Sequence, residues 1–245
     1  MLNSDKRVVT TFLNVENKTV ERLKTGCEPI DDLLNGGIEK GIITNVYGES
    51  GTGKTNFCIQ VAKQVAENGK TPVYIDTEGG FSPERFLQMS TEEALDGLLY
   101  REATSFEEQI EVIKELEDLN IKNLGLIVVD SAVSLYRLNV NGENASEVNQ
   151  KLSQQLSTLS KLAREHNIPV VITNQVYTSF DEENMELVGR DVPRYWSKSL
   201  LKLSEKNDGS RVLEIGKHRS LPEGISAQFK ITDAGLVATD KQGLF

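Results

Sequence analysis

The sequence predicts one α/β domain built on a mostly parallel sheet. Short apolar segments alternate along the chain with longer segments whose apolar residues recur every three or four positions, a pattern typical of strands alternating with helices. A chain of 245 residues with 38% hydrophobic content can bury one good core. Residues 1–24 are read as an arm or edge strand, and residues 25–245 as the domain.

The expected elements follow in order, and two of the helices carry clear signals at an end. The helix that starts at Ser105 has Glu108 at the third position, which completes a capping box. The helix over 146–166 has an apolar face and stops before Pro169. The full expected order is a helix over 30–34, a turn at 36–37, a strand over 42–47, a helix over 54–68, a strand over 73–75, helices from 82 and 105, a strand over 124–129, the helix over 146–166 and a strand over 170–173.

The apolar segments of the C-terminal part are shorter and more closely spaced than those before them. Four short apolar segments lie close together after residue 199, over 200–203, 211–215, 227–231 and 236–239. Connections this short favour antiparallel pairing, so we expect an antiparallel C-terminal edge on the sheet.

Composition restricts the partners and the location. Lys and Arg number 27 against 37 Asp and Glu, a formal charge of −10, which is opposite to the basic field of a strong autonomous nucleic-acid binder. Any nucleic-acid binding should therefore be local or conditional. Cys27 and Cys58 have neither paired spacing nor a histidine cluster, so we expect no disulfide or cysteine metal site and place Cys58 in the core. Without a membrane-length apolar run or a signal-like N-terminus, the expected location is cytoplasmic, with no membrane partner.

Residues 48–55 read GESGTGKT and match the phosphate-binding pattern G-x-x-x-x-G-K-[ST]. The glycines let backbone N–H groups turn inward, Lys54 reaches the phosphate oxygens, and the Thr55 hydroxyl is a Mg²⁺ ligand. The segment lies between an expected strand and helix, where the helix dipole favours an anion. The loop residues expected to contact ATP are Gly48, Glu49, Ser50, Gly51, Thr52, Gly53, Lys54, Thr55 and Asn56.

Three further strands are expected to deliver polar groups to the same sheet edge. Asp130 ends one apolar strand and is expected to hold Mg²⁺ through water. Asp76 and Glu78 follow another, with Glu78 the candidate base for the attacking water and Asp76 in support, unless both only cap the next turn. Gln175 ends a third and is a candidate γ-phosphate sensor, unless it only stabilises a turn.

Several motifs in this order resemble the core ATPase of the RecA family, in its archaeal and eukaryotic recombinase branch. They are TGCEPIDDLLNGGIEKGIITNVYGESGTGKT, YIDTEGGFSPERF, LIVVDSAVSLYR and VVITNQV, and the likeness runs from about Thr25 to the C-terminus. The resemblance implies a RecA-like P-loop fold with ATP sites between subunits. It also implies that Glu78 activates water, that Gln175 senses the γ-phosphate and that Arg85 packs against adenine.

The stretch GKHRSLPEG resembles a K-x-R element that RecA-fold relatives insert into a neighbour's nucleotide. Lys217 and Arg219 alternate across His218 and would project from one face of a strand, with His218 on the other. A cation inserted in this way can raise the rate of ATP hydrolysis by several orders of magnitude. The alternative is a solvated strand edge. By the same resemblance, Asp233 belongs to a segment that caps a neighbour's adenine.

Two loops that enter DNA in recombinases lack the excess of positive charge expected of a DNA-binding loop here. Residues 176–198 hold three basic residues against five acidic ones, and neither the helical N-terminal domain nor the Phe-x-x-Ala polymerisation element of full recombinases is matched. The end of this loop, GRDVPRYWSKS, nevertheless mixes cations with aromatic rings, as single-stranded nucleic-acid sites do. The same residues could instead form a protein-binding hot spot or cover the sheet. They are Arg190, Arg194, Tyr195, Trp196 and Lys198.

A short chain with a complete ATP site and eroded DNA loops resembles an archaeal paralogue of the strand-exchange recombinase. The resemblance implies an accessory protein of homologous recombination and DNA repair, with slow, DNA-responsive, Mg²⁺-dependent ATP hydrolysis. The expected partners are single-stranded or branched DNA, a recombinase or recombination nuclease, and further copies of the chain. The alternative is a nucleotide-gated interaction module with little ATPase activity or direct DNA binding.

Overall fold

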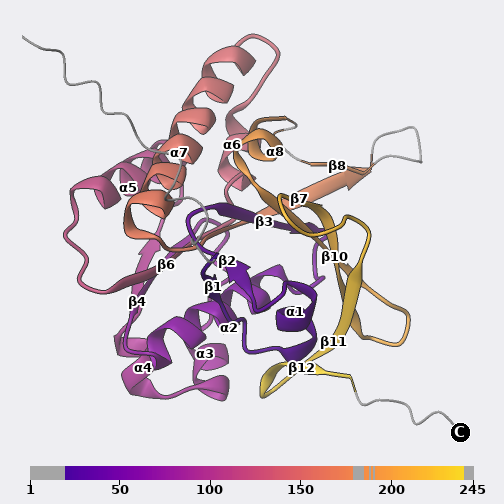
Figure 1. The fold of residues 1–245 in the computed structure, drawn as a ribbon. Helices are drawn as coiled ribbons and strands as arrows, with labels where there is room; N and C mark the ends of the chain where they lie inside the picture. Colours follow the sequence, from indigo (N-terminus) through magenta and orange to yellow (C-terminus); the bar gives the residue numbers. More distant parts are fainter. Residues whose placement is uncertain (1–19, 179–184, 188, 190, 240–245) are drawn as a thin grey trace, which may run out of the picture.

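A large sheet lies between two layers of helices in the computed structural model, which describes residues 20–178, 185–187, 189 and 191–239 (Figure 1). Within these residues the strand order is β12-β11-β10-β9-β3-β7-β6-β4-β5, with β8 paired to β7 and a separate pair β1-β2. The elements are β1 Arg22–Leu23, α1 Glu28–Leu33, β2 Ile38–Glu39, β3 Ile43–Gly48, α2 Lys54–Glu67, β4 Thr71–Asp76, α3 Pro83–Met89, α4 Glu92–Asp96, β5 Leu99–Glu102, α5 Phe106–Asp118, β6 Leu124–Asp130, α6 Ser134–Asn139, α7 Ala145–His166, β7 Val170–Thr178, β8 Met185–Leu187, α8 Asp191–Trp196, β9 Ser199–Glu205, β10 Arg211–His218, β11 Ser226–Thr232 and β12 Gly235–Ala238.

The direction of the strands brings several strand ends to one edge. β3, β7, β6, β4 and β5 pair in parallel, and β9 joins β3 in parallel as well. In this register Gly48 lies opposite Gln175, and Asp76 opposite Asp130. Ligands of open α/β sheets bind at the carboxyl ends of the strands, so this edge is where a site is expected.

From β9 onward the sheet is antiparallel, which confirms the expected C-terminal edge. β10 runs against β9, β11 against β10 and β12 against β11. The turns at both ends of β11 therefore lie at opposite edges of the sheet. The turn between β11 and β12 lies at the edge where β3 ends, as does the start of β10.

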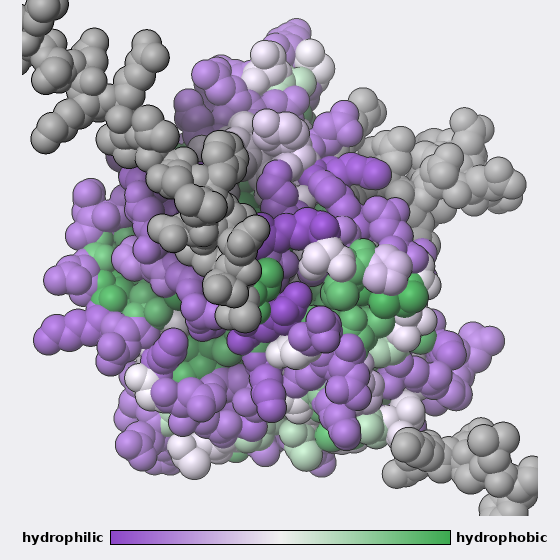
Figure 2. Space-filling view, in the orientation of Figure 1, coloured by the Kyte–Doolittle hydropathy of each residue, from purple (hydrophilic) through white to green (hydrophobic). Residues whose placement is uncertain are grey.

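Two apolar cores lie on the two faces of the sheet. Side chains alternate along β6, so Val128 packs with α2 in one core, while Ile127 and Val129 pack against α5 and α7 in the other. Cys58 of α2 is fully buried in the first core, as expected. In the orientation of Figure 2 the surface is mostly hydrophilic, with separate apolar patches. No helix in the described part of the chain is long and apolar enough to span a membrane.

Most expected elements are confirmed, and the short ones were missed. Ser105 caps α5 by accepting from the Glu108 N–H at 3.1 Å, and α7 ends before Pro169. The sequence pattern did not predict α4, β5, α6 or α8, because each has at most six residues, too few to establish a periodicity. Of the N-terminal arm, residues 1–19 lie outside the described part, while Arg22 and Leu23 pair with β2 as an edge strand.

Candidate nucleotide-binding site

The P-loop connects β3 to α2, as expected. α2 begins at Lys54, with Gly53 as its N-cap at φ 104°, a conformation that residues with a Cβ rarely adopt. A Cβ on Gly53 would also collide with the Ile231 side chain of β11, and one on Gly48 with the Leu203 carbonyl of β9. The loop is therefore enclosed by neighbouring strands as well as bent by its own glycines.

Lys54 is held inside the loop. Its Nζ donates to the carbonyls of Gly48 and Glu49 at 3.0 and 2.8 Å, and the Glu49 carbonyl also accepts from the Thr52 hydroxyl at 2.9 Å. Burial lowers the pKa of Lys54, while the nearby carboxylates of Asp130 and Glu78 act to raise it. A cation with these surroundings is positioned to meet the negative charge of a phosphate.

Asp130 is fixed by two hydroxyl groups that the sequence analysis did not single out. It is 5% exposed at the end of β6, and its Oδ2 and Oδ1 accept from Tyr74 at 2.8 Å and Thr173 at 2.5 Å. Burial, and then the charge of Asp130, raise the pKa of Tyr74, so the phenol remains a donor. The available signal was a hydroxyl residue inside each of two aliphatic strands, β4 and β7.

Asp76 and Glu78 have different surroundings. Asp76 is buried and accepts from the N–H groups of Glu78, Gly80 and Phe81 at 3.1, 3.2 and 2.8 Å, so it holds the turn after β4. Glu78 instead accepts from Gln175 Nε2, at 3.1 Å on Oε1 and 3.3 Å on Oε2. This contact joins the turn after β4 to Gln175 within β7.

The pKa of Glu78 is raised. Burial of its carboxylate is the largest cause and the charge of Asp130 the second, while Lys54 and hydrogen bonds from Ser131 and Gln175 act in the opposite direction. A carboxylate with a raised pKa is a better proton acceptor than an ordinary exposed glutamate.

These groups line one cleft of about 190 Å³. It contains P-loop N–H donors at the start of α2, a buried lysine, and the two carboxylates of Glu78 and Asp130. This is the donor set that a Mg²⁺ nucleotide requires, and the residues fit that group. The lining residues are Ser50, Gly51, Gly53, Lys54, Thr55, Asn56, Glu78, Asp130, Thr173 and Gln175.

Arg85 lies beside the P-loop helix, against the C-terminal hairpin. Its guanidinium donates to Asn56 Oδ1 at 2.8 Å and to the carbonyls of Thr232 and Asp233 at 2.7 and 3.2 Å. Asp233, predicted to act on a neighbouring subunit, is thus near Arg85 and the P-loop of its own chain.

Lys217 and Arg219 lie far from that cleft. β10 runs antiparallel to β9 and ends opposite Ser199, at the sheet edge where β3 begins. Lys217 Nζ donates to the carbonyls of Arg194 and Ser197 at 3.0 and 3.1 Å. Neither cation can therefore serve the nucleotide cleft of its own chain.

The expected alternation across His218 is wrong. The register shifts between Ile215 and Lys217, and Arg219 forms an ion pair with the buried Glu39. His218 Nε2 lies 3.8 Å from the same carboxylate, so His218 and Arg219 converge rather than face apart. β10 ends at His218, so Arg219 lies past the strand, where the period of two on which the expectation depended no longer applies.

The residues near α8 divide into a partly buried and an exposed set. Trp196 donates to Ser153 Oγ of α7 at 3.0 Å and packs against the core, as a covering residue does. Tyr195 is 71% exposed, with its ring 5.6 Å from that of Trp196 and 5.8 Å from Lys198 Nζ. Arg194 is also exposed, and Arg190 lies outside the described residues.

Replacing Tyr195 and Trp196 one at a time should separate these roles. Trp196→Ala removes a partly buried indole and its hydrogen bond to Ser153, and should lower the free energy of unfolding by about 2 kcal/mol, whereas Tyr195→Ala should change it by less than about 0.5 kcal/mol. Urea denaturation measures both. Similar losses for the two variants would show that this division is wrong.

Comparison with known proteins agrees with this architecture. The Rad51 family model matches residues 16–239. The "DNA repair and recombination protein RadB" of Methanococcoides burtonii is 41% identical over 224 residues, covering 89% of this chain and 99% of the relative. That of Thermoplasma acidophilum is 38% identical, covering 89% and 94%.

Solved structures give the same result. A structure described as "Crystal structure of the RadB recombinase" superposes with a TM-score of 0.78 at 37% identity, covering 89% of this chain and all of the other. Family model, full-length relatives and fold therefore agree: this chain belongs to the Rad51 family of RecA-like proteins and has the RadB proteins among its relatives.

Proposed function

We propose that this protein binds Mg²⁺ and ATP at the P-loop cleft, hydrolyses ATP slowly, and acts as an accessory protein of homologous recombination and DNA repair. The observation that carries the proposal is the convergence of Lys54, Asp130, Glu78 and Gln175 in one cleft. The names of the RadB relatives support the recombination role.

In this proposal the residues of the cleft have separate roles. The P-loop N–H groups and Lys54 hold the phosphates, and Thr55 and Asp130 hold Mg²⁺, Asp130 through water. ATP, when bound, supplies the phosphoanhydride that is cleaved. Glu78 takes the proton of the attacking water, and Gln175 orients that carboxylate and responds to the γ-phosphate.

The contact between Glu78 and Gln175 also offers a route from nucleotide to partner. Gln175 lies in β7, at the start of the segment that ends in α8. A change in the contact at Gln175 would therefore reach the exposed cations and ring near α8. We infer that Arg194, Tyr195 and Lys198, with Arg190, contact single-stranded or branched DNA or a recombination protein. Trp196 holds α8 against α7 through its hydrogen bond to Ser153.

Self-association would complete the site. Lys217 and Arg219 lie at the edge opposite their own P-loop, which suits a role at a neighbour's nucleotide. Arg219 is bound in its own chain to Glu39, and Lys217 to carbonyls, so both would have to exchange partners on assembly. That exchange is consistent with slow hydrolysis in an isolated chain.

Nucleotide titration calorimetry, with and without Mg²⁺, tests the binding part directly. We expect one ATP per chain and tighter binding with Mg²⁺, because Asp130 needs a counter-ion beside the triphosphate. Absence of ATP binding at millimolar nucleotide would rule out the proposed function.

The raised pKa of Glu78 predicts a specific pH dependence of turnover. The base acts as a carboxylate, so activity should fall as pH decreases through a pKa above the usual glutamate range. Gln175→Ala removes a hydrogen bond that favours the carboxylate, so the acidic limb should move to still higher pH. Turnover measured from pH 4 to 8, with about pH 4.3 as the ordinary glutamate value, checks both. An acidic limb that stays in place in the variant would contradict the assignment.

A further inference from the structure

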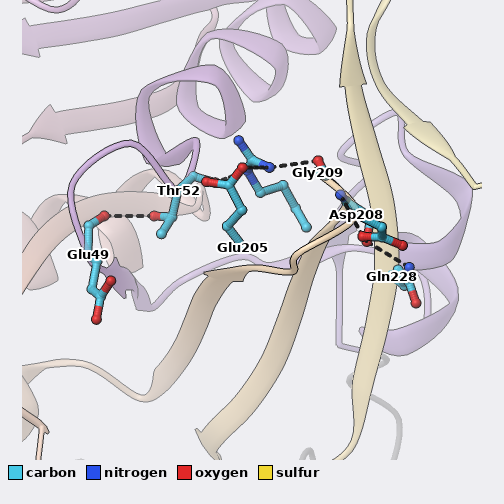
Figure 3. Close-up of polar contacts among 8 residues, drawn as sticks. Glu49, Thr52, Glu205, Asp208, Gly209 and Gln228 are labelled. Carbon is cyan, nitrogen blue, oxygen red and sulfur yellow. Dashed lines mark hydrogen bonds and ion pairs between the residues drawn. The ribbon is translucent and has the colours of Figure 1, made fainter.

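Arg211 reaches the outer side of the P-loop from the antiparallel part of the sheet. Its Nε donates to the Thr52 carbonyl at 3.0 Å. This contact is possible because β10 starts at the edge where β3 ends. Figure 3 shows Glu49 and Thr52 of the loop next to Glu205 and Gly209 of the hairpin that joins β9 to β10.

The guanidinium is fixed on its other side by the hairpin. Nη1 lies 2.8 Å from Glu205 Oε1 and donates to the Gly209 carbonyl at 2.7 Å, and the side chain of Arg211 is only 14% exposed. A planar guanidinium with contacts at both Nε and Nη1 has little freedom to rotate. Arg211 is therefore a rigid link between the hairpin and the P-loop.

The hairpin turn that carries these contacts is itself well ordered by hydrogen bonds. The Lys206 N–H donates to the Ser210 carbonyl at 2.9 Å, and the Gly209 N–H to the Lys206 carbonyl at 3.0 Å. Asp208 Oδ1 accepts from Ser210 N at 3.0 Å and from its Oγ at 2.5 Å, while Gln228 of β11 donates to Ser210 Oγ at 2.7 Å (Figure 3). The support behind Arg211 thus extends across two antiparallel strands.

The carbonyl that Arg211 binds shares a peptide group with a phosphate-binding donor. In a planar trans peptide, the C=O of Thr52 and the N–H of Gly53 point in opposite directions. Gly53 is the N-cap of α2, where no side chain accepts a hydrogen bond from the first turn, and it lines the cleft. A cation that holds the carbonyl outward directs the Gly53 N–H inward and polarises it as a donor.

We propose that Arg211 is a positioning residue for nucleotide binding, which orients the peptide between Thr52 and Gly53 toward the phosphates. This inference rests on the proposed ATP site and adds a residue outside the P-loop motif to it. Because the effect is on a backbone donor for the phosphates shared by ATP and ADP, both nucleotides should depend on it equally.

Arg211→Met keeps the apolar stem and removes the guanidinium. We expect ATP and ADP affinity, measured by calorimetry well below the melting temperature, to fall about tenfold each, with their ratio unchanged. Arg211→Lys keeps a cation but not the fork, and should recover part of the loss. Lys206→Met is the matched control, because it removes a cation of the same turn whose Nζ donates to Gln228 Oε1 of β11 at 3.0 Å rather than to the P-loop.

The outcomes separate this inference from the proposed function. Wild-type affinity in Arg211→Met, or an equal loss in Lys206→Met, would overturn the positioning role while leaving the ATP site intact. A lower melting temperature with unchanged affinity would also overturn it, because that is the result of a purely structural role. Failure of the unaltered chain to bind either nucleotide would instead reject the ATP site.

Discussion

Replacing Lys54 with alanine is expected to weaken ATP binding at least about 100-fold, the largest effect on binding of any single change. The ammonium group is the only lysine donor inside the cleft as the structure describes it, and it already donates to the loop carbonyls of Gly48 and Glu49. Its loss removes both the charge that meets the phosphates and an internal support of the loop. Calorimetric titration with ATP measures the change.

Lys63→Ala is the matched control for this variant. Lys63 is in the same helix, and its Nζ pairs with Glu67 at 3.2 Å, one turn away. Surface pairs of this kind contribute about 0–1 kcal/mol to stability, and this pair has no contact with the cleft. ATP affinity that remains near wild type in Lys54→Ala, or falls as far in Lys63→Ala, would contradict the assignment of the phosphate site.

Replacing Glu78 with glutamine should lower ATP turnover about 100-fold or more while ATP affinity is retained. Glutamine keeps the shape of the side chain but cannot accept the proton of water. It also removes a negative charge close to Asp130, which should favour the bound nucleotide. Phosphate release and ATP binding, measured on the same preparation, separate the two effects.

The control for Glu78→Gln is Glu102→Gln, at the end of β5 and exposed. It removes the same charge from the same sheet edge. β5 is the outermost strand on that side of the sheet, away from the P-loop that follows β3, so turnover should be unchanged. If Glu78→Gln also changes little, the nucleotide is structural and the protein is better described as a nucleotide-gated interaction module. A variant trapped with ATP bound would support the hydrolytic role.

The local parts of the site could be predicted from the sequence. The P-loop, α2 and the end of β6 at Asp130 follow from short contiguous patterns, in which strand, turn and helix signals agree, whereas β7 continues past Gln175 to Thr178. Parallel strands then bring their carboxyl ends to one edge, so the meeting of Glu78, Asp130 and Gln175 also follows.

The remaining parts depend on pairs that are distant in the sequence. Tyr74 and Asp130 are 56 residues apart, and Arg211 and Thr52 are 159 apart. No local pattern specifies such contacts, because they arise from the order and register of the strands. His218 and Arg219 converge on Glu39 for the same reason: β10 ends at His218, so Arg219 no longer follows the alternation of the strand and meets a residue from the other end of the chain.

The roles proposed for Arg219 and Asp233 also differ in what their positions support. Arg219 follows β10 at the edge opposite its own P-loop, so it cannot reach the nucleotide of its own chain. Asp233 lies beside Arg85 of its own chain, so its action on a neighbour stays a prediction. The proposed dependence on assembly therefore rests on Lys217 and Arg219.

The most direct test of the central claim is ATP turnover per chain as a function of protein concentration, with and without single-stranded DNA, at low and moderate salt. We predict turnover that rises with concentration, is stimulated by DNA and loses that stimulation as salt screens the cations near α8. Turnover per chain that is constant on dilution, indifferent to DNA and unaffected by Lys217→Gln and Arg219→Gln would contradict it.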